Sequence, residues 1–464
     1  MNTFTAITLS LTCMASIGTA LAVDSITETE KVVPSGGVSN DSAGWSIAMD
    51  GDLMAIGSPK DNTTDGGGDA GSVTVIDAAG NEHLLTASNA GIYENFGYSV
   101  DVRGNLLIAG APLHPITTRE GAAYIYRRNN NGNWVEEAQL VAPGGQWSDF
   151  FGCSVAISET TAVVGAYLSD IEGPSSGTAW VFEYDGCCDW ELVQRLVPSS
   201  PTVKFGTSVA IGDERIIVGS PRDNIDGLSA GSAYIFYLDR SDNDWEEEQR
   251  LVGSDTAAFD YFGYAVDINE DGDLAVMGAI YNDAAAPNAG AAYVYRLDRS
   301  DDSWIEQEQL VPSGDEAWQK FGSSVSIDGS RAAVGCYGYP DSPGHGYLYE
   351  ETTEDGWVEV VKLVTTDGEN GARVGYKAAL SGSNVLLGAP WQDSEAGAAY
   401  YYDLDRAAQG GDLNFDGVVN IFDLLVVLRD WGECPDTPAP CNGDSDRNEL
   451  VDVLDLLAVL EAWN

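Results

Sequence analysis

The chain has few basic residues. Lysine and arginine together number 22 against 73 aspartates and glutamates, so the formal net charge is −51 at pH 7. A surface of that sign repels phosphate backbones and anionic lipid headgroups. The composition therefore argues against nucleic acid as a partner and makes cations the natural counter-species.

The chain also lacks the motifs of several common catalytic sites. It has three histidines, His83, His114 and His345, which lie in dissimilar sequence contexts, and it contains neither a G-x-S-x-G elbow nor an HExxH motif. We therefore predict that the protein is not an enzyme. A catalytic pair among the many carboxylates stays open as the alternative.

Long hydrophobic runs are missing as well. After the first residues, no stretch approaches the ~20 apolar residues that a membrane-spanning helix needs. Residues 1–22 hold a short apolar run without acidic groups and end on Ala20-Leu21-Ala22, the small-x-small pattern that signal peptidase reads. We expect a signal peptide cleaved after Ala22 and a secreted or cell-surface protein without a transmembrane segment. A lipid anchor at Cys13 is the alternative.

Cysteines are few and fall into three groups. Cys434 and Cys441 lie within the short segment "ECPDTPAPC". An oxidising compartment makes disulfides possible, and we predict one between these two because it would close a short linker loop. Cys153 and Cys336 are predicted to be buried small hydrophobic residues. The pairing of Cys187–Cys188, in a predicted turn, stays open.

What the chain has is one unit repeated seven times. A first motif, usually an aromatic residue followed by glycine, occurs as "GW" at Gly44, "FGYSV" at Phe96, "FGCSV" at Phe151, "FGTSV" at Phe205, "FGYAV" at Phe262, "FGSSV" at Phe321 and "VGYKA" at Val374. A second motif follows each as "AIGSP" at Ala55, "IAGAP" at Ile108, "VVGAY" at Val163, "IVGSP" at Ile217, "VMGAI" at Val276, "AVGCY" at Ala333 and "LLGAP" at Leu386. The motifs recur about every 55 residues, so the units account for residues 23–406.

Each unit predicts four β-strands. Two apolar strands contain the two motifs, an alternating aromatic run such as "GSAYIFYLD" follows, and a polar run such as "WEEEQRLVGS" ends the unit. Four-stranded units repeated radially form a β-propeller, because each sheet can bury both faces only against its neighbours. We therefore predict an all-β, seven-bladed propeller over residues 23–406.

The motifs resemble the FG-GAP repeat family, which forms the propeller of integrin α subunits and of many bacterial exported proteins. The resemblance implies that calcium often binds between the two motifs in a D-x-D-x-D-G-x-x-D loop. Unit five approaches that pattern at Asp267, Asn269, Asp271 and Asp273, with Gly272 in place and Ala275 where the last aspartate is expected. A weak calcium site there is one interpretation, and an ordinary solvated hairpin is the other.

The loops after the second motif are rich in aspartate, asparagine and glycine. They include "SPKDNTTDGGGDAG" and "SPRDNIDGLSAG", and a propeller places all of them on one side of the disc. Binding loops on a rigid scaffold often occupy such places. The alternative is that these residues are turn formers that make an edge soluble.

The seventh unit lacks its fourth strand. It ends at "GAAYYYDLD", while "ITETEKVVPSGG" near the mature N-terminus matches the end of the fourth strand in other units, such as "VQRLVPSS". We predict that Ile26–Val33 forms the outer strand of the last blade and closes the ring.

Residues 407–464 change in character. Two copies of an acidic loop are each followed by an apolar run at helical spacing, "NIFDLLVVLRDWG" and "VDVLDLLAVLEAW". Calcium favours six to eight oxygen ligands, which a twelve-residue loop supplies from positions one, three, five, seven, nine and twelve. The first loop offers Asp412, Asn414, Asp416, the carbonyl of Val418, Asn420 and Asp423; the second offers Asp444, Asp446, Asn448, the carbonyl of Leu450, Asp452 and Asp455. Glu449 stands in the second loop where glycine is expected, which predicts a weaker site.

This pair resembles a dockerin type I domain. The resemblance implies bound Ca²⁺ and a cohesin-like or cell-surface protein as partner. Positions ten and eleven of each loop, which help to choose the cohesin in that family, are here Ile421, Phe422, Val453 and Leu454. These apolar pairs predict a docking patch, and the alternative is that they belong to the small domain's own core.

Three functions are compatible with these features. The first is an exported, non-catalytic binding or adhesion module, whose propeller takes a polysaccharide or an extracellular protein and whose tail tethers it. The second is a lyase or hydrolase that acts on polysaccharides or lipids, because some propellers of this family accompany or form such enzymes. The third is a purely structural surface protein.

Overall fold

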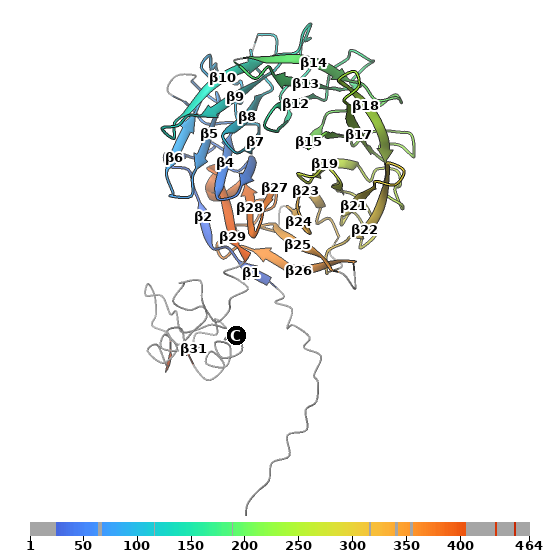
Figure 1. The fold of residues 1–464 in the computed structure, drawn as a ribbon. Helices are drawn as coiled ribbons and strands as arrows, with labels where there is room; N and C mark the ends of the chain where they lie inside the picture. The colour runs from blue at the N-terminus through green and yellow to red at the C-terminus, as the bar shows by residue number, and fades with distance from the viewer. Residues whose placement is uncertain are drawn as a thin grey trace, which may run out of the picture.

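A computed structural model describes residues 25–63, 67–115, 117–187, 189–314, 317–338, 342–352, 356–404, 432–433 and 450–451. Within these residues, seven sheets stand radially around a central axis and form the blades of a disc (Figure 1). The all-β seven-bladed propeller predicted from the sequence is confirmed.

Each blade runs from an innermost strand at the axis to an outer strand at the periphery. The innermost strands are β3 (Ser46–Asp50), β7 (Ser99–Arg103), β11 (Ser154–Ile157), β15 (Ser208–Gly212), β19 (Phe262–Ile268), β23 (Phe321–Asp328) and β27 (Lys377–Ser381). The second strands are β4 (Leu53–Ser58), β8 (Leu106–Ala111), β12 (Thr161–Ala166), β16 (Arg215–Ser220), β20 (Leu274–Ala279), β24 (Arg331–Cys336) and β28 (Asn384–Ala389).

The outer half of each blade contains the aromatic and the polar runs. The third strands are β5 (Ser72–Ile76), β9 (Ala122–Arg128), β13 (Thr178–Tyr184), β17 (Ser232–Asp239), β21 (Ala291–Asp298), β25 (His345–Thr352) and β29 (Ala398–Asp403). The outer strands are β6 (Glu82–Leu85), β10 (Trp134–Leu140), β14 (Trp190–Leu196), β18 (Asp244–Leu251), β22 (Ser303–Leu310), β26 (Gly356–Val364) and, in blade seven, β2 (Glu30–Val32).

The burial pattern explains why these runs have their composition. Second strands such as β8 and β12 are buried at every residue, because neighbouring blades cover both faces of the sheet, and they therefore read as continuous apolar runs. The outer strand β18 is mostly exposed or half-buried between a buried Trp245 and a buried Leu251, so its charged residues face water. The largest core side chains include the motif phenylalanines and the third-strand tyrosines: Phe96, for example, packs edge-on against Tyr124 at a centroid distance of 5.6 Å.

The N-terminal segment contributes to two blades. β2 pairs antiparallel with β29 and forms the outer strand of blade seven, while β1 (Ser25–Thr27) pairs parallel with β26 and adds a fifth strand to blade six. The single strand predicted over Ile26–Val33 is therefore divided. The chain crosses between the blades at Glu28 and Thr29, because the Glu28 carboxylate accepts hydrogen bonds from Thr366 of blade six and the Thr29 N–H donates to Tyr401 of blade seven.

Little else lies outside the blades. α1 (Gln392–Glu395) is a turn rather than a regular helix, because Asp393 and Ser394 have positive φ. In the tail, β30 (Gly432–Glu433) pairs antiparallel with β31 (Leu450–Val451). The predicted signal peptide, the two helical runs and the Cys434–Cys441 pair otherwise lie outside the described residues, so the dockerin-like domain stays a prediction.

Candidate functional site

The two sequence motifs meet between adjacent blades. The glycine of the second motif packs against the backbone of the next blade's first motif: a Cβ on Gly165 would lie 2.2 Å from the carbonyl oxygen of Gly206. Gly206 itself has φ +83°, a left-handed conformation that favours glycine. The same contact recurs between Gly219 and Gly263. The repeated glycines therefore let the innermost ends of the blades approach backbone to backbone.

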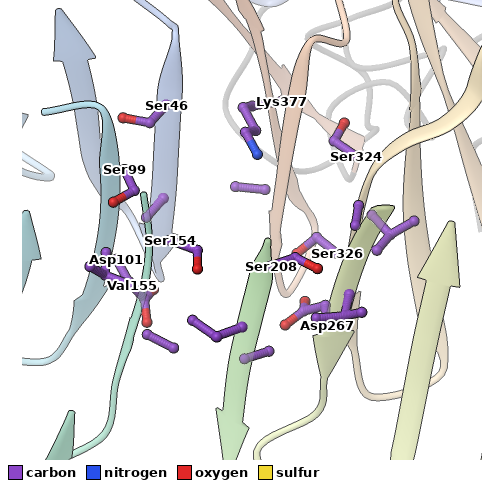
Figure 2. A pocket seen from close by; sticks show the side chains of 18 of the residues that line it. Ser46, Ser99, Asp101, Ser154, Val155, Ser208, Asp267, Ser324, Ser326 and Lys377 are labelled. Atoms are coloured by element: carbon purple, nitrogen blue, oxygen red, sulfur yellow. The ribbon is translucent and has the colours of Figure 1, made fainter. Parts of the chain in front are cut away.

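A serine in the first motif fastens these contacts. The Ser154 hydroxyl donates to the Gly206 carbonyl of the next blade at 2.9 Å, and the Ser46 hydroxyl donates to Gly97 at 2.8 Å. Ser99, Ser208 and Ser324 donate in the same way to Gly152, Gly263 and Gly375. Lys377 replaces this serine in blade seven. Ala265 takes its place in blade five. The result is a set of five hydroxyl groups around the axis, interrupted at Ala265 and at Lys377; Figure 2 shows the serines and the lysine.

The innermost strands enclose a cavity of about 580 Å³ on the axis. Among its lining residues, the Arg103 guanidinium of blade two forms an ion pair with the Glu270 carboxylate of blade five at 2.7 Å. These blades are not neighbours in the ring, so the pair crosses the channel beside the hairpins that join innermost and second strands. We call this side of the disc the hairpin face, and the opposite side, where the first motif begins and the second motif ends, the loop face.

Two carboxylates inside the channel bridge neighbouring blades. Asp101 accepts hydrogen bonds from the N–H groups of Val102 and of Ile157 in the next blade, at 2.9 and 2.8 Å. Asp267 accepts equivalent bonds from Ile268 and Ile327, and both side chains point into the cavity in Figure 2. Burial raises the pKa of Asp101 to about 7 and that of Asp267 to about 6, against the opposing effect of these N–H donors.

These pKa shifts predict a pH-dependent contribution to stability. In each case the folded pKa lies above the value of about 4 in an unfolded chain, so the folded protein holds a proton that the unfolded chain releases. Each contribution is present in full below pH ~4 and is lost as the pH rises through the folded pKa. Urea denaturation between pH 4.5 and 8 should therefore show the unfolding free energy of wild type falling relative to those of Asp101→Asn and Asp267→Asn. We expect a fall on the order of 1–2 kcal/mol, because both carboxyl groups are only half-buried and solvent screens them.

The two variants control for each other. The relative change seen with Asp267→Asn should be complete about one pH unit below that seen with Asp101→Asn, as the folded pKa values of about 6 and about 7 require. If the unfolding free energies of both variants stay parallel to that of wild type from pH 4.5 to 8, the raised pKa values of Asp101 and Asp267 are wrong.

The residue just before the first motif has a left-handed backbone in every blade. These residues are Ser42, Asn95, Phe150, Lys204, Tyr261, Lys320 and Arg373, with φ of 59°, 57°, 59°, 65°, 59°, 58° and 60° in that order. In blade one, Ala43 stands before Gly44 where most motifs have phenylalanine. This conformation costs on the order of 1 kcal/mol for most L-residues and is cheaper for asparagine. Lysine, arginine and aromatic residues are therefore held there against the backbone preference, a situation that is common at functional sites.

Residues after the second motif stack on these left-handed residues. The Lys204 ammonium lies 4.6 Å from the Tyr167 ring centroid, and the Arg373 guanidinium lies 4.0 Å from that of Trp391. Lys320 lies over both Tyr281 and Tyr337, at 5.7 and 4.7 Å, and Arg222 lies over Tyr261 at 5.4 Å. We call this set of cations and rings the mouth ring; it consists of Tyr167, Lys204, Arg222, Tyr261, Tyr281, Lys320, Tyr337, Arg373 and Trp391.

The mouth ring continues into the channel through aromatic contacts. Tyr376 packs against Tyr337, Trp391 and Trp45 at centroid distances of 5.6, 5.2 and 5.2 Å, and Trp45 also packs against Tyr98. Trp45, Tyr98 and Tyr376 line the cavity together with Tyr264. The loop face therefore leads into the cavity through a collar of aromatic rings and cations.

The cations of this region are not neutralised by carboxylates. Within the described residues, most lysines and arginines form ion pairs, but Lys204, Arg222, Lys320, Arg373 and Lys377 form none. Lys377 lines the channel and is surrounded by protein, and this desolvation lowers its pKa. Desolvation, together with the charge of Arg222, also lowers the pKa of Lys204. The mouth therefore carries positive charge on a strongly acidic protein.

Exposed aromatic residues surround the mouth ring on the same face. Tyr93, Phe259 and Trp318 stand three residues before the phenylalanine of their motif, have φ between 65° and 74°, and are about half exposed. Trp147, four residues before Phe151, is 70% exposed. Large apolar side chains are thus displayed to solvent on the loop face, three of them on left-handed backbone, a feature common at interaction surfaces.

The chain leaves the propeller on the opposite side. The Leu404 N–H donates to the carbonyl of Ser383, in the hairpin between β27 and β28, so β29 ends at the hairpin face. Leu404, the last described residue of the propeller, therefore lies away from the mouth ring.

The predicted calcium loop of unit five does not assemble a ligand cluster. Asp267 is turned into the channel, and the Asn269 amide is used within the hairpin, where its oxygen accepts from the N–H groups of Asp273 and Leu274. Asp273 forms an ion pair with Arg299 at 3.2 Å. The Asn269 amide N–H also donates to the Asp273 carboxylate at 3.0 Å, so two of the four predicted residues are brought together while Asp267 is turned into the channel. Calcium at this loop stays a prediction.

The carboxylates after the second motif serve the fold. Asp223 is fully buried and accepts hydrogen bonds from Ser232 and Tyr234, and Asp61 accepts one from Ser72 at 2.6 Å. A binding role for the acidic loops stays a prediction. The sequence analysis did not single out another recurring feature of the same face: in five of the seven blades a lysine, arginine or aromatic residue stands directly before the first motif.

The remaining predicted residues are placed as follows. Cys153 and Cys336 are buried, as expected, and burial raises the pKa of Cys153 to about 11. His114 is buried and lies 2.6 Å from the Glu94 carboxylate, while burial, with a smaller effect of Lys362, lowers the pKa of His345 to about 3. The twelve tail ligands from Asp412 to Asp455, the apolar pairs at Ile421, Phe422, Val453 and Leu454, and the cysteines Cys434 and Cys441 lie outside the residues whose side chains are described.

One group of acids lies close together where β17 and β18 meet. The carboxylate oxygens of Asp239, Asp242 and Glu246 lie within 4.8 Å of one another there. None of the helices in the described part of the chain has the length and apolarity needed to cross a membrane.

Comparison with known proteins identifies the repeat. The family model described as FG-GAP repeat matches residues 26–76, 80–126, 134–182, 190–236, 245–295, 304–349 and 357–402. Among solved structures, the chain is similar to Sqt1 of Saccharomyces cerevisiae, with a TM-score of 0.44 and 12% identity over 82% of this chain and 86% of that one. A likeness of that size adds nothing to the fold already described. No curated protein matches the chain.

Proposed function

Because the chain belongs to the FG-GAP repeat family, we propose that it is an exported, non-catalytic binding and adhesion module. In this proposal the loop face of the propeller binds an extracellular partner, and the dockerin-like tail binds calcium and tethers the protein to a cohesin-like or cell-surface protein. The observation that carries the proposal is the loop face itself, where unpaired cations and exposed aromatic residues gather around the channel.

The geometry of the chain supports a presenting role. The tail begins at the hairpin face, because Leu404 is bonded to the β27–β28 hairpin, whereas the mouth ring and Trp147 lie on the loop face. A tether attached on one side leaves the other side free for a second partner. A closed ring of blades is also a rigid support, which reduces the entropy lost when a surface is ordered on binding.

A non-catalytic role agrees with how the described histidines are used. His345 is buried with a pKa lowered to about 3, so it is not poised to exchange protons near neutral pH, and the ring of His114 is hydrogen-bonded to Glu94. Both carboxylate oxygens of Asp101 and of Asp267 accept backbone N–H groups.

The proposal is tested by affinity capture from the extracellular fraction of the source organism. Three full-length proteins are compared with and without calcium: wild type, the loop-face variant Trp147→Ser with Phe259→Ser, and the tail variant Asp412→Ala with Asp423→Ala. We expect one set of partners that requires calcium and is lost with the tail variant, and a second set that is lost with the loop-face variant only.

Leu84→Ser is the matched control for the loop-face variant, because Leu84 is an exposed apolar residue, at 62%, on the outer strand β6. It should retain both sets of partners. If neither the propeller nor the tail captures anything, or if Leu84→Ser loses partners as readily as the loop-face variant, the proposal is wrong.

A second candidate function has one specific observation in its favour. Asp101 and Asp267 have pKa values of about 7 and about 6 inside a cavity, a range in which a carboxyl group can act as a general acid. This favours the alternative of a polysaccharide-acting or lipid-acting lyase or hydrolase. Release of shortened products from polysaccharides by wild type, abolished by Asp267→Asn, would replace the binding proposal with the enzymatic one.

A further inference from the structure

We propose that the mouth ring and the cavity beneath it bind an acidic oligosaccharide, whose carboxylate or sulfate groups pair with Lys204, Arg222, Lys320 and Arg373. This inference rests on the proposed binding function and names the chemical class of its ligand. The interaction would take place on the loop face, with part of the ligand entering the cavity.

The charges of the mouth ring complement an anionic ligand. The chain has a formal net charge of −51, so a lysine or arginine on the propeller usually has a carboxylate within reach, as Arg215 has in Glu248 and Arg250 in Asp226. Lys204, Arg222, Lys320, Arg373 and Lys377 have none among the described residues, although they gather in one region. Arg119 and Lys362 are the other described cations without an ion pair.

The placement of these cations carries a backbone cost. Lys204, Lys320 and Arg373 occupy the left-handed position before the first motif, where Asn95 in blade two shows the residue that the backbone prefers. Their stacking on aromatic rings, as of Arg373 on Trp391 at 4.0 Å, fixes the charged groups but leaves their charge uncompensated. An anionic ligand supplies the missing counter-charge.

The cavity also presents polar groups. Tyr98, Tyr264 and Tyr376 line it, and their hydroxyl groups form no hydrogen bond with another described residue. The ring serines donate to glycine carbonyls but keep lone pairs that can accept from a ligand. A wall of hydroxyl groups and aromatic edges suits a ligand rich in hydroxyl groups.

These features favour an acidic sugar over an acidic peptide. A peptide brings N–H and C=O groups that must be paired when they are desolvated, whereas a sugar brings hydroxyl groups that match the tyrosine and serine hydroxyls. The cavity of about 580 Å³ lies within the range of pockets that bind small ligands. It can receive one end of an oligosaccharide chain.

The test is calorimetric titration of the full-length protein with four probes. Two are acidic oligosaccharides, tetragalacturonate for carboxylates and a heparin tetrasaccharide for sulfates; the others are neutral cellotetraose and an octaglutamate peptide. We expect binding of at least one acidic oligosaccharide that weakens with added salt, and no binding of cellotetraose. Lys204→Gln with Arg222→Gln should weaken binding at least about tenfold, and which acidic sugar binds distinguishes carboxylate from sulfate.

Lys362→Gln is the matched control, because Lys362 also lies over an aromatic ring, Tyr347, without an ion pair, but on the outer strand β26. It should bind as wild type does. Each variant's melting temperature is compared with wild type, and Lys320→Gln with Arg373→Gln repeats the test at another part of the mouth if the first variant does not fold.

The ligand class is wrong if wild type binds neither acidic oligosaccharide, if the mouth variants bind as tightly as Lys362→Gln, or if octaglutamate binds in place of the sugars. Affinity capture separates this failure from that of the proposed function. If wild type still captures loop-face partners while both acidic oligosaccharides fail to bind, only the ligand class falls.

Discussion

Deleting residues 23–34 is expected to lower the melting temperature of the propeller by about 10 °C or more, which for a domain of this size corresponds to a loss of roughly 8 kcal/mol. The deletion removes β2 and exposes the edge of β29. It also removes the buried side chain of Val32, which packs with Ala399 and Leu386 in the core of blade seven.

The segment also carries the contacts that link outer strands around the disc. In other blades a serine after one outer strand donates from its N–H and hydroxyl to a glutamate of the next, as Ser254 does to Glu306. At the closure, Thr366 donates in this way to Glu28, and the Ser35 N–H donates to Glu82 of blade one at 2.9 Å. The deletion removes the Glu28 link to blade six, and Ser35, which remains, loses the strand that places it beside Glu82. The glycine contacts at the innermost ends of blades six, seven and one remain, so the loss falls on the outer part of blade seven.

Lys31→Met is the control that separates strand pairing from ion pairing. Lys31 bridges Asp367 and Asp393 at 2.6 and 2.8 Å, with partly exposed partners, so its loss should cost on the order of 1 kcal/mol. Differential scanning calorimetry compares the deletion, Lys31→Met and wild type. A deletion that melts with wild type would show that the N-terminal segment does not hold the ring closed.

The fold could be predicted because its signals repeat. A single "FG" is a weak signal. The same phenylalanine–glycine pair recurs at Phe96, Phe151 and Phe205 and in later units, and each copy reflects the same packing requirement. That requirement is the close contact of glycine backbones in neighbouring blades, such as Gly165 and Gly206. The division of the N-terminal strand could not be predicted in this way. It depends on where Glu28 reaches a neighbouring blade, a contact that occurs once and leaves no repeated pattern.

The site was harder to predict because it is built from differences between the units. The left-handed residue before the first motif is serine, asparagine, phenylalanine, tyrosine, lysine or arginine, so no consensus points to it. Only the ring geometry brings Lys204, Lys320 and Arg373 to one mouth. The carboxylates after the second motif looked more conspicuous, yet Asp223 is fully buried in hydrogen bonds of its own blade.

We expect the tail to fold with calcium, and this is the second large effect. The two predicted loops place acids such as Asp412, Asp416 and Asp423 within one short turn, where without a cation the carboxylates repel one another over a few ångströms. Calcium binding should therefore appear as folding free energy. Far-UV circular dichroism of the full-length protein should gain a helical signal when calcium replaces chelator, and titration calorimetry should show binding, while the propeller's melting transition hardly moves.

Paired substitutions distinguish specific calcium sites from the general attraction of cations to an acidic protein. Asp412→Ala with Asp423→Ala should remove the stronger site and most of the helical gain, and Asp444→Ala with Asp455→Ala should cost less, because Glu449 already replaces the loop glycine at a cost on the order of 1 kcal/mol. Asp239→Ala with Asp242→Ala removes two acids from the exposed cluster of the propeller and is the matched control. If that control lowers calcium binding as much as the tail variants do, or if the helical signal is complete in chelator, the acidic spacing of the tail reflects solvated turns rather than metal loops. A loss confined to the tail variants would instead show that calcium sets the fold of the tether and, through it, the attachment of the propeller.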